Sequence, residues 1–278
     1  MSEAKQLPIG LFDSGMGGLT VFKALAQELP TESLLYLGDT ARLPYGTKAP
    51  STIVRYTLKA AQRLVDLGIK MLVVACNTAT AAALPTLRTH FAPLPVLGVV
   101  EPGAQAAALA SRNGHIVVIA TEATIAGGAY QQAIVRLRPD AVVIARACTL
   151  FVPLAEEGWM DGPLVEGVAR RYLEDIFPNQ DRRQRTSPDT LLLGCTHFPL
   201  LQAALQQVVG SHVRIVDSAA TTAQHVARTL KACDLLHGGQ GAGVYKFLTT
   251  DNATRFARTG SLFLGRPLDA KEVAVVDI

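Results

Sequence analysis

Excess charge of one sign and long apolar stretches are both scarce in this chain. Its 26 Lys and Arg residues nearly balance 23 Asp and Glu residues, and the net charge of +3 argues against a nucleic-acid partner held by charge. No uninterrupted apolar run reaches about 18 residues, so no membrane span is expected. The first residues carry no secretory signal. We therefore expect a cytoplasmic protein that has no membrane partner.

Cysteine is rare as well. The 278 residues include only Cys76, Cys148, Cys195 and Cys233, without paired spacing. This argues against a disulfide framework, and no CxxC or HxxxH spacing sets out ligands for a metal. A hydrophobic content of 49% is instead typical of an ordinary globular chain with one large or two modest cores.

One basic cluster stands out, formed by Arg182, Arg183 and Arg185 in a polar stretch between two prolines. An acidic residue interrupts the cluster, and aromatic residues are few around it. These features favour a solvated surface loop over a nucleic-acid patch.

Apolar runs alternate with helix-period segments along most of the chain, which is typical of βα units around a parallel sheet. The apolar runs predict strands at residues 9–12, 34–37, 71–75, 96–100, 116–120, 141–145, 191–193 and 213–216. Helices are predicted in most of the gaps, such as residues 51–67, 78–87, 103–111, 126–137, 164–177, 200–209 and 221–235. The predicted fold class is therefore α/β.

An internal echo favours two smaller sheets over a single barrel. A strand with a glycine-bearing loop occurs at residues 8–18 and again at 115–128, and a cysteine-bearing turn follows later in each half. We predict two similar domains, each a mostly parallel sheet flanked by helices, that face each other across a cleft. The first would comprise residues 1–97 plus 212–278, and the second residues 98–211. Residues 237–243 are predicted to be a glycine-rich loop before a short C-terminal elaboration.

Two of the cysteines share a local setting. Cys76 and Cys195 each follow an apolar run and precede a predicted helix. Asn-Thr comes directly after Cys76, and Thr comes directly after Cys195. Amide groups and the positive end of the dipole at such a helix start predict a lowered thiol pKa, which favours the thiolate. A small buried core residue is the alternative for either cysteine taken alone. The duplicated setting favours two groups that act on opposite sides of one substrate.

Small polar residues follow several predicted strands at the sheet edge where open parallel sheets bind ligands. The loop at residues 13–18 matches neither GxGxxG nor a phosphate loop, but its glycines would expose amide groups to an anion. We predict a compact polar pocket for a zwitterionic or dicarboxylate molecule, with no slot for a large cofactor. Capping of a helix remains the alternative role for each hydroxyl.

Four strings in the sequence resemble the signatures of the bacterial glutamate racemase family. They occupy residues 9–20 (IGLFDSGMGGLT), 38–46 (GDTARLPYG), 75–79 (ACNTA) and 194–201 (GCTHFPLL), and residues 151–158 (FVPLAEEG) fit the family's acidic segment. The resemblance implies two pseudo-symmetric α/β domains with the active site between them. It also implies cofactor-independent interconversion of L- and D-glutamate, which supplies D-glutamate for peptidoglycan.

The resemblance further implies roles for individual residues. Cys76 is expected to take the α-proton from D-glutamate, and Cys195 the α-proton from L-glutamate. Asp13 would assist Cys76, while Glu156 and His197 would assist Cys195. The expected substrate contacts are Asp13, Ser14, Tyr45, Gly46, Asn77, Thr78, Thr196 and His197, together with Thr121, which follows a predicted strand at the same edge.

Some alternatives stay open from the sequence. Glu157 directly follows Glu156, so either acid could be the assisting group. An aspartate or hydantoin racemase would share the paired cysteines but fits the strings at residues 12–15 and 196–199 less well. A binding role, as a small-ligand sensor or toward an enzyme such as DNA gyrase, is a second class of function. A homodimer is compatible with the sequence.

Overall fold

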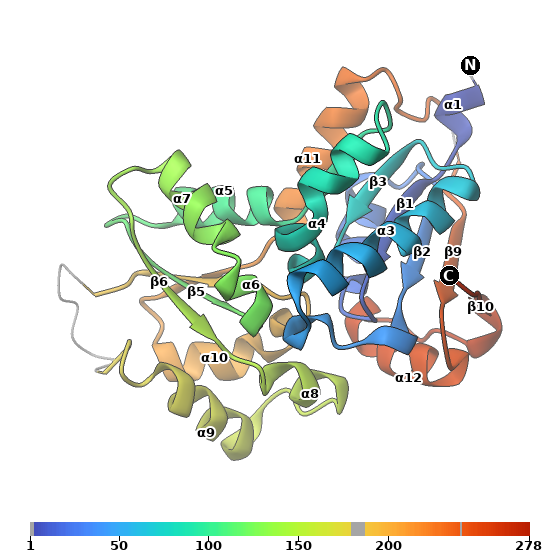
Figure 1. Cartoon of the computed structure of the whole chain (residues 1–278). Helices are drawn as coiled ribbons and strands as arrows, with labels where there is room; N and C mark the ends of the chain where they lie inside the picture. The colour runs from blue at the N-terminus through green and yellow to red at the C-terminus, as the bar shows by residue number, and fades with distance from the viewer. Residues whose placement is uncertain (1–2, 179–186, 240) are drawn as a thin grey trace.

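The computed structural model describes residues 3–178, 187–239 and 241–278, which form two parallel β-sheets flanked by helices (Figure 1). The six-stranded sheet has the order β10-β9-β2-β1-β3-β4, and the four-stranded sheet has the order β6-β5-β7-β8. We call the first sheet with its helices the first lobe, and the second sheet with its helices the second lobe. The α/β class predicted from the sequence is confirmed.

The strands of the first sheet are β1 (Ile9–Asp13), β2 (Leu34–Gly38), β3 (Met71–Val74), β4 (Val96–Gly98), β9 (Tyr245–Thr249) and β10 (Val273–Val275). Those of the second sheet are β5 (His115–Ala120), β6 (Val142–Ala147), β7 (Thr190–Leu193) and β8 (Arg214–Val216). The α-helices are α1 (Glu3–Gln6), α2 (Leu19–Glu28), α3 (Pro50–Asp66), α4 (Asn77–His90), α5 (Val100–Ala110), α6 (Glu122–Ala126), α7 (Ala129–Leu137), α8 (Phe151–Glu156), α9 (Gly162–Leu173), α10 (Gln202–Val209), α11 (Ala219–Ala232) and α12 (Ala253–Leu264). Single 3₁₀ turns are η1 (Thr40–Arg42), η2 (Tyr45–Thr47), η3 (Phe198–Leu201) and η4 (Ala270–Glu272).

Burial explains why the apolar runs become central strands. Every residue of β1, β2, β3 and β7 is buried, as expected for parallel strands covered by helices on both faces. The helix α3 shows the complementary pattern: it begins at Pro50, which suits a first helical turn, and it buries Ile53, Thr57 and Leu64 along one face.

The structure differs from the predicted strands where the chain passes between the sheets. The strand predicted at residues 96–100 ends at Gly98, because α5 begins at Val100. The strand β8 pairs with β7, so the second sheet extends to Val216. The predicted return to the first domain at residue 212 is therefore too early for β8.

The C-terminal part contributes more to the fold than the predicted short elaboration. β9 pairs with β2, and β10 pairs with β9, so this part of the chain extends the first sheet. The helix α12 follows β9 and packs against α2. The sequence predicts none of these three elements individually.

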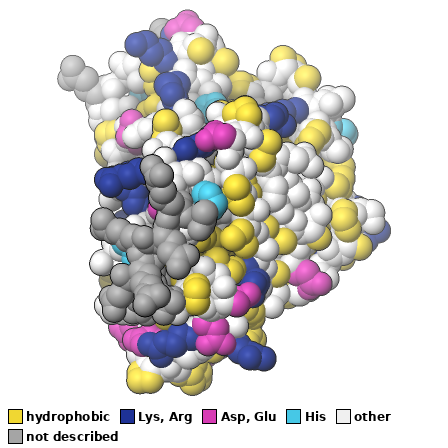
Figure 2. Space-filling model, turned by 90° about the vertical axis from the view of Figure 1, so that its left-hand side faces the viewer, with side chains coloured by type: hydrophobic (Ala, Val, Ile, Leu, Met, Phe, Trp, Pro, Cys, Tyr) yellow, Lys and Arg dark blue, Asp and Glu magenta, His cyan; other side chains and the backbone are white. Residues whose placement is uncertain are grey.

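The surface carries charges of both signs. On the face shown in Figure 2, described Lys and Arg side chains are interspersed with Asp and Glu. The cluster of Arg182, Arg183 and Arg185 lies outside the described residues. Within the described part of the chain, no helix is long and apolar enough to cross a membrane.

A buried ion pair joins the segments that lead into β2 and β3. The Lys70 ammonium lies 2.5 Å from the Glu32 carboxylate, and each side chain is 1% exposed. Lys70 also donates to the Lys5 carbonyl, and the Glu32 carboxylate accepts the amide of His237. The pair therefore ties the N-terminal turn and the segment after α11 to the first sheet.

Replacing Lys70 by Met should destabilise the protein strongly. The change leaves the Glu32 carboxylate buried without its cation, and we expect the free energy of unfolding to fall by about 3–5 kcal/mol. The exposed pair of Arg170 and Glu166 provides the control, since Arg170→Met should cost less than about 1 kcal/mol. Urea denaturation measures both variants, and equal stabilities would contradict the structural role of Lys70.

Candidate active site

A small cavity lies between the two lobes, where the carboxyl ends of the central strands face each other. Its lining consists of Ser14, Gly15, Leu43, Pro44, Tyr45, Gly46, Cys76, Asn77, Thr78, Thr121, Val152, Glu156, Cys195, Thr196 and His197. The cavity volume is about 40 Å³, which is room for one or two water molecules. A larger ligand can therefore enter only if the walls move apart.

The Cys76 thiol lies on the first-lobe wall of this cavity. Cys76 caps α4, and its Sγ accepts a hydrogen bond from the amide of Ala79 at 3.4 Å. The Ser14 hydroxyl lies 3.4 Å from the same sulfur. The predicted helix start after the cysteine is confirmed.

The predicted lowering of the Cys76 pKa is wrong. Burial and, to a smaller extent, the nearby Asp13 carboxylate together raise the pKa of this thiol to about 12, against the opposing effect of the hydrogen bonds from Ser14 and Ala79. Loss of hydration outweighs the helix start because the two hydrogen bonds at the sulfur replace only part of the water that a thiolate would bind. Cys76 therefore holds its proton in this closed form of the site.

The Cys195 thiol faces a different partner on the second-lobe wall. Its Sγ lies 3.8 Å from His197 Nδ1, and His197 Nε2 lies 3.2 Å from Glu156 Oε1. Burial alone would lower the His197 pKa, but the contacts with Cys195 and Glu156 outweigh burial and raise the pKa to about 10. The imidazole is therefore cationic near neutral pH.

Glu156, and not Glu157, makes this contact. Glu157 is exposed, whereas the Glu156 carboxylate lies between His197 and Arg255, whose Nη2 is 3.5 Å from Oε2. Burial would raise the pKa of Glu156, but the hydrogen bond and charge of His197, with the charge of Arg255, lower it overall. Of the two neighbouring acids that the sequence offers, Glu156 is therefore the one in contact with His197.

Asp13 lies close to the cavity without lining it. It ends β1 and is 1% exposed, and its Oδ2 accepts the amide of Gly15 at 2.9 Å. Its Oδ1 is buried and has no hydrogen-bond partner among the described residues. Burial raises the pKa of Asp13, although the charge of His197 and the amides of Gly15 and Gly18 oppose the rise.

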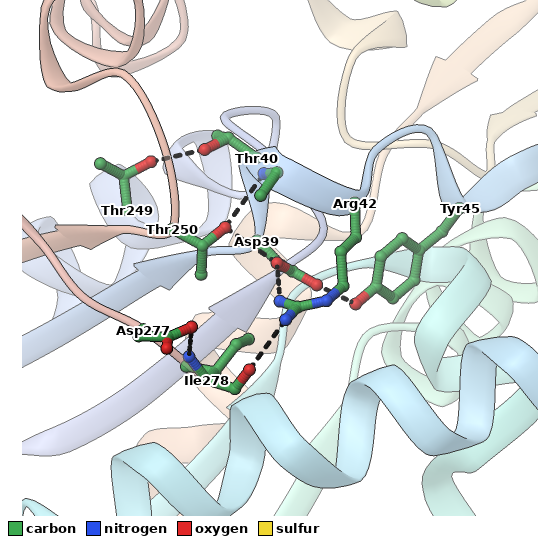
Figure 3. Close-up of polar contacts among 9 residues, drawn as sticks. Asp39, Thr40, Arg42, Tyr45, Thr249, Thr250, Asp277 and Ile278 are labelled. Atoms are coloured by element: carbon green, nitrogen blue, oxygen red, sulfur yellow. Dashed lines mark hydrogen bonds and ion pairs between the residues drawn. The ribbon is translucent and has the colours of Figure 1, made fainter.

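A buried carboxylate positions the loop that carries Tyr45 and Gly46 (Figure 3). Asp39 follows β2 and is fully buried. Its two oxygens accept hydrogen bonds from the Tyr45 hydroxyl at 2.6 Å, from the Arg42 guanidinium at 2.9 Å and from the Thr250 hydroxyl at 2.9 Å. These bonds hold η2 against the cavity.

Contacts between the lobes are close around the site. The hydroxyls of Thr78, Thr121 and Thr124 lie within 3.0 Å of one another, and Thr78 belongs to the first lobe while the other two belong to the second. A Cβ on Gly17 would lie 2.4 Å from Thr196 Oγ1, and one on Gly46 would lie 2.6 Å from Thr121 Cβ. Glycine at these two positions therefore permits the lobes to close.

The predicted site residues thus come together, and the structure adds others. The cavity is lined by Ser14, Tyr45, Gly46, Cys76, Asn77, Thr78, Thr121, Glu156, Cys195, Thr196 and His197. Asp13 does not line it, but accepts a hydrogen bond from the amide of Gly15, which does. Leu43, Pro44 and Val152 also line it, and these apolar residues give no chemical signal in the sequence. Arg255 reaches Glu156 from α12, a contact that nothing local predicts.

The other two cysteines lie elsewhere. Cys148 is buried, and Cys233 is exposed after α11. Within the described residues, no group of three or more His, Cys, Asp and Glu side chains has an arrangement that could hold a metal ion.

Comparison with known proteins places the chain in a family. The family model for Asp/Glu/Hydantoin racemase matches residues 9–226. A glutamate racemase of Geobacter metallireducens is 48% identical over 260 residues, covering 94% of this chain and 93% of the relative. The chain belongs to the glutamate racemase family. The resemblance noted in the sequence motifs is therefore confirmed.

Solved structures of glutamate racemases share this architecture. The enzyme of Thermus thermophilus, in complex with β-chloro-D-alanine, superposes with a TM-score of 0.85 at 43% identity, covering 99% of this chain and 98% of the other. The enzyme of Francisella tularensis, in complex with D-glutamate, has a TM-score of 0.87 at 33% identity and covers 98% of both chains. The two-lobed fold is thus a fold of this family.

The burial of Cys76 should control its reactivity. Iodoacetamide at pH 8 should label the exposed Cys233 first, whereas Cys76 and Cys148, whose pKa values are raised to about 12, should react slowly because the thiolate is the reactive form. Asp13→Asn should speed the labelling of Cys76 because it removes a charge that raises the thiol pKa.

Peptide mass spectrometry follows each cysteine separately. Cys148 is the internal control, because burial raises its pKa without a contribution from Asp13. Labelling of Cys76 ahead of Cys233 would show that the thiol is not held in its protonated form.

Proposed function

We propose that this protein interconverts L- and D-glutamate, with Cys76 and Cys195 as the two acid–base groups. One observation carries the proposal: two thiols, one from each lobe, line a single closed cavity, and each has an ionisable neighbour of its own. The relative from Francisella tularensis was solved with D-glutamate, which supports glutamate as the substrate.

Inversion at an α-carbon needs a base on one face and an acid on the other. The His197 imidazolium lies next to Cys195, while burial and Asp13 keep Cys76 protonated. In this state the Cys195 thiolate would remove the α-proton of L-glutamate, and the Cys76 thiol would protonate the opposite face to give D-glutamate. The reverse reaction then begins from a Cys76 thiolate and a Cys195 thiol.

The carbanion formed between the two steps needs stabilisation at the substrate carboxylate. Hydrogen-bond donors in a site that excludes water provide this more effectively than water does. Ser14, Asn77 and Thr196 line the cavity beside the two thiols, and Asn77 Nδ2 is buried without a hydrogen-bond partner among the described residues. We assign these groups to the substrate, and we propose that the D-glutamate product serves peptidoglycan synthesis.

An aspartate or hydantoin racemase would share the paired cysteines, so the substrate preference of this protein needs a direct measurement. Circular dichroism of D-glutamate and D-aspartate, each incubated with the purified protein, separates the candidates. Faster turnover of D-aspartate than of D-glutamate would replace the proposed substrate.

Removing either thiol should abolish racemisation. Cys76→Ala and Cys195→Ala each leave one face of the α-carbon without a proton carrier, and the double variant should lose little more because the pair acts as a unit. In deuterated water, Cys76→Ala should retain slow exchange of the α-proton of L-glutamate, and Cys195→Ala that of D-glutamate. Proton NMR measures the exchange. Racemisation at close to the wild-type rate in either single variant would refute the two-thiol mechanism.

The ionisable neighbours should each contribute to the rate. Asp13→Asn and His197→Asn change the proton affinity of one thiol and should lower activity by roughly 10²–10⁴-fold. Because the enantiomers have equal free energy in water, kcat/KM must fall by the same factor in both directions, although kcat and KM can change separately. Steady-state kinetics in both directions measure these effects. Normal rates for both variants would show that Asp13 and His197 have structural roles only.

A further inference from the structure

We propose that Tyr130 is a positioning residue that fixes the side-chain amide of Asn77 so that its NH₂ group faces a carboxylate of the substrate. This inference rests on the proposed racemisation of glutamate. Tyr130 belongs to α7 in the second lobe and lies outside all four motifs that resemble the family signatures.

The decisive contact is one hydrogen bond across the lobes. The Tyr130 hydroxyl donates to Asn77 Oδ1 at 2.5 Å, and both side chains are buried. Because the carbonyl end of the amide is used in this way, the NH₂ end must point elsewhere. Asn77 lines the cavity, and its Nδ2 is buried without a hydrogen-bond partner in the described parts of the chain. A buried donor left unsatisfied at a cavity wall is costly unless a ligand completes it.

Close packing holds the Tyr130 ring in place. A Cβ on Gly103 would lie 3.1 Å from the Tyr130 hydroxyl, and a Cβ on Gly194 would lie 2.9 Å from its ring. Gly194 directly precedes Cys195, and Asn77 directly follows Cys76. Tyr130 therefore contacts the turns that carry both thiols, although it does not line the cavity itself.

Without the tyrosine hydroxyl, the amide could rotate by half a turn. The Asn77 carbonyl would then face the substrate carboxylate, and two oxygens with partial or full negative charge would repel each other. Binding would weaken in both directions of the reaction, while the two thiols would keep their places. The expected effect is therefore on KM more than on kcat.

A double-mutant cycle tests the inference. Tyr130→Phe, Asn77→Ala and the combined variant are compared with the wild type by circular dichroism, with L- and D-glutamate as substrates. We expect Tyr130→Phe to raise KM about 10-fold for both enantiomers, as the loss of one hydrogen bond to a charged group does. In the Asn77→Ala background the same change should leave KM unaltered, because no amide remains to be oriented.

Tyr172→Phe is the matched control. The Tyr172 hydroxyl accepts the amide of Leu150 in the second lobe and lies outside the cavity, so KM should not change. Thermal unfolding of every variant shows whether it folds. If Tyr130→Phe does not fold, Tyr130→Met takes its place, since it also lacks the hydroxyl and should raise KM in the same direction.

Each outcome is decisive. If the fold-changes in KM of Tyr130→Phe and Asn77→Ala multiply in the combined variant, Tyr130 acts elsewhere and the inference is overturned. An unchanged KM in a folded Tyr130→Phe variant would overturn it as well. Failure of the wild type to racemise glutamate would instead overturn the proposed function, and the assignment of Tyr130 would fall with it. A rise in KM that disappears in the Asn77→Ala background supports the positioning role.

Discussion

Both thiols of the site lie out of water, and much of the surrounding structure follows from this constraint. A thiolate that loses its hydration needs a compensating charge or donor, so the neighbours of each thiol decide how readily it ionises. The two thiols have different neighbours. Cys76 has the carboxylate of Asp13 nearby and keeps its proton, whereas Cys195 has the imidazolium of His197. A pseudo-symmetric pair of lobes thus encloses an electrostatically asymmetric pair of thiols.

Close contact between the lobes excludes water from the site, and two glycines near the cavity permit that contact. Gly17 and Gly46 allow the first-lobe loops to approach Thr196 and Thr121 more closely than any side chain would. Arg255 then reaches across the lobes to Glu156, which holds His197. The His197 imidazolium is therefore stabilised by residues of both lobes. Separating the lobes would weaken this stabilisation and would also expose the two thiols to water.

The sequence predicts most of the site because its residues follow strand ends, where local pattern and function coincide. Cys76 and Thr121 each come directly after or close to a buried strand, and apolar runs locate such strands well. Tyr130 and Arg255 escape prediction because they reach the site from helices, and only tertiary packing brings them there. The return at residue 212 is misplaced for the same reason, since β8 is short and half-buried and gains its place only by pairing with β7.

The wrong direction predicted for the Cys76 pKa has a more general cause. A helix start is a local feature that the sequence displays, and its effect on a thiol is favourable but modest. Burial depends on the whole fold, because the second lobe covers a thiol that the first lobe presents. In a two-lobed site the opened form would rehydrate Cys76 and remove much of the penalty on its thiolate. The proton affinity of Cys76 therefore depends on the second lobe as much as on the helix that the thiol caps.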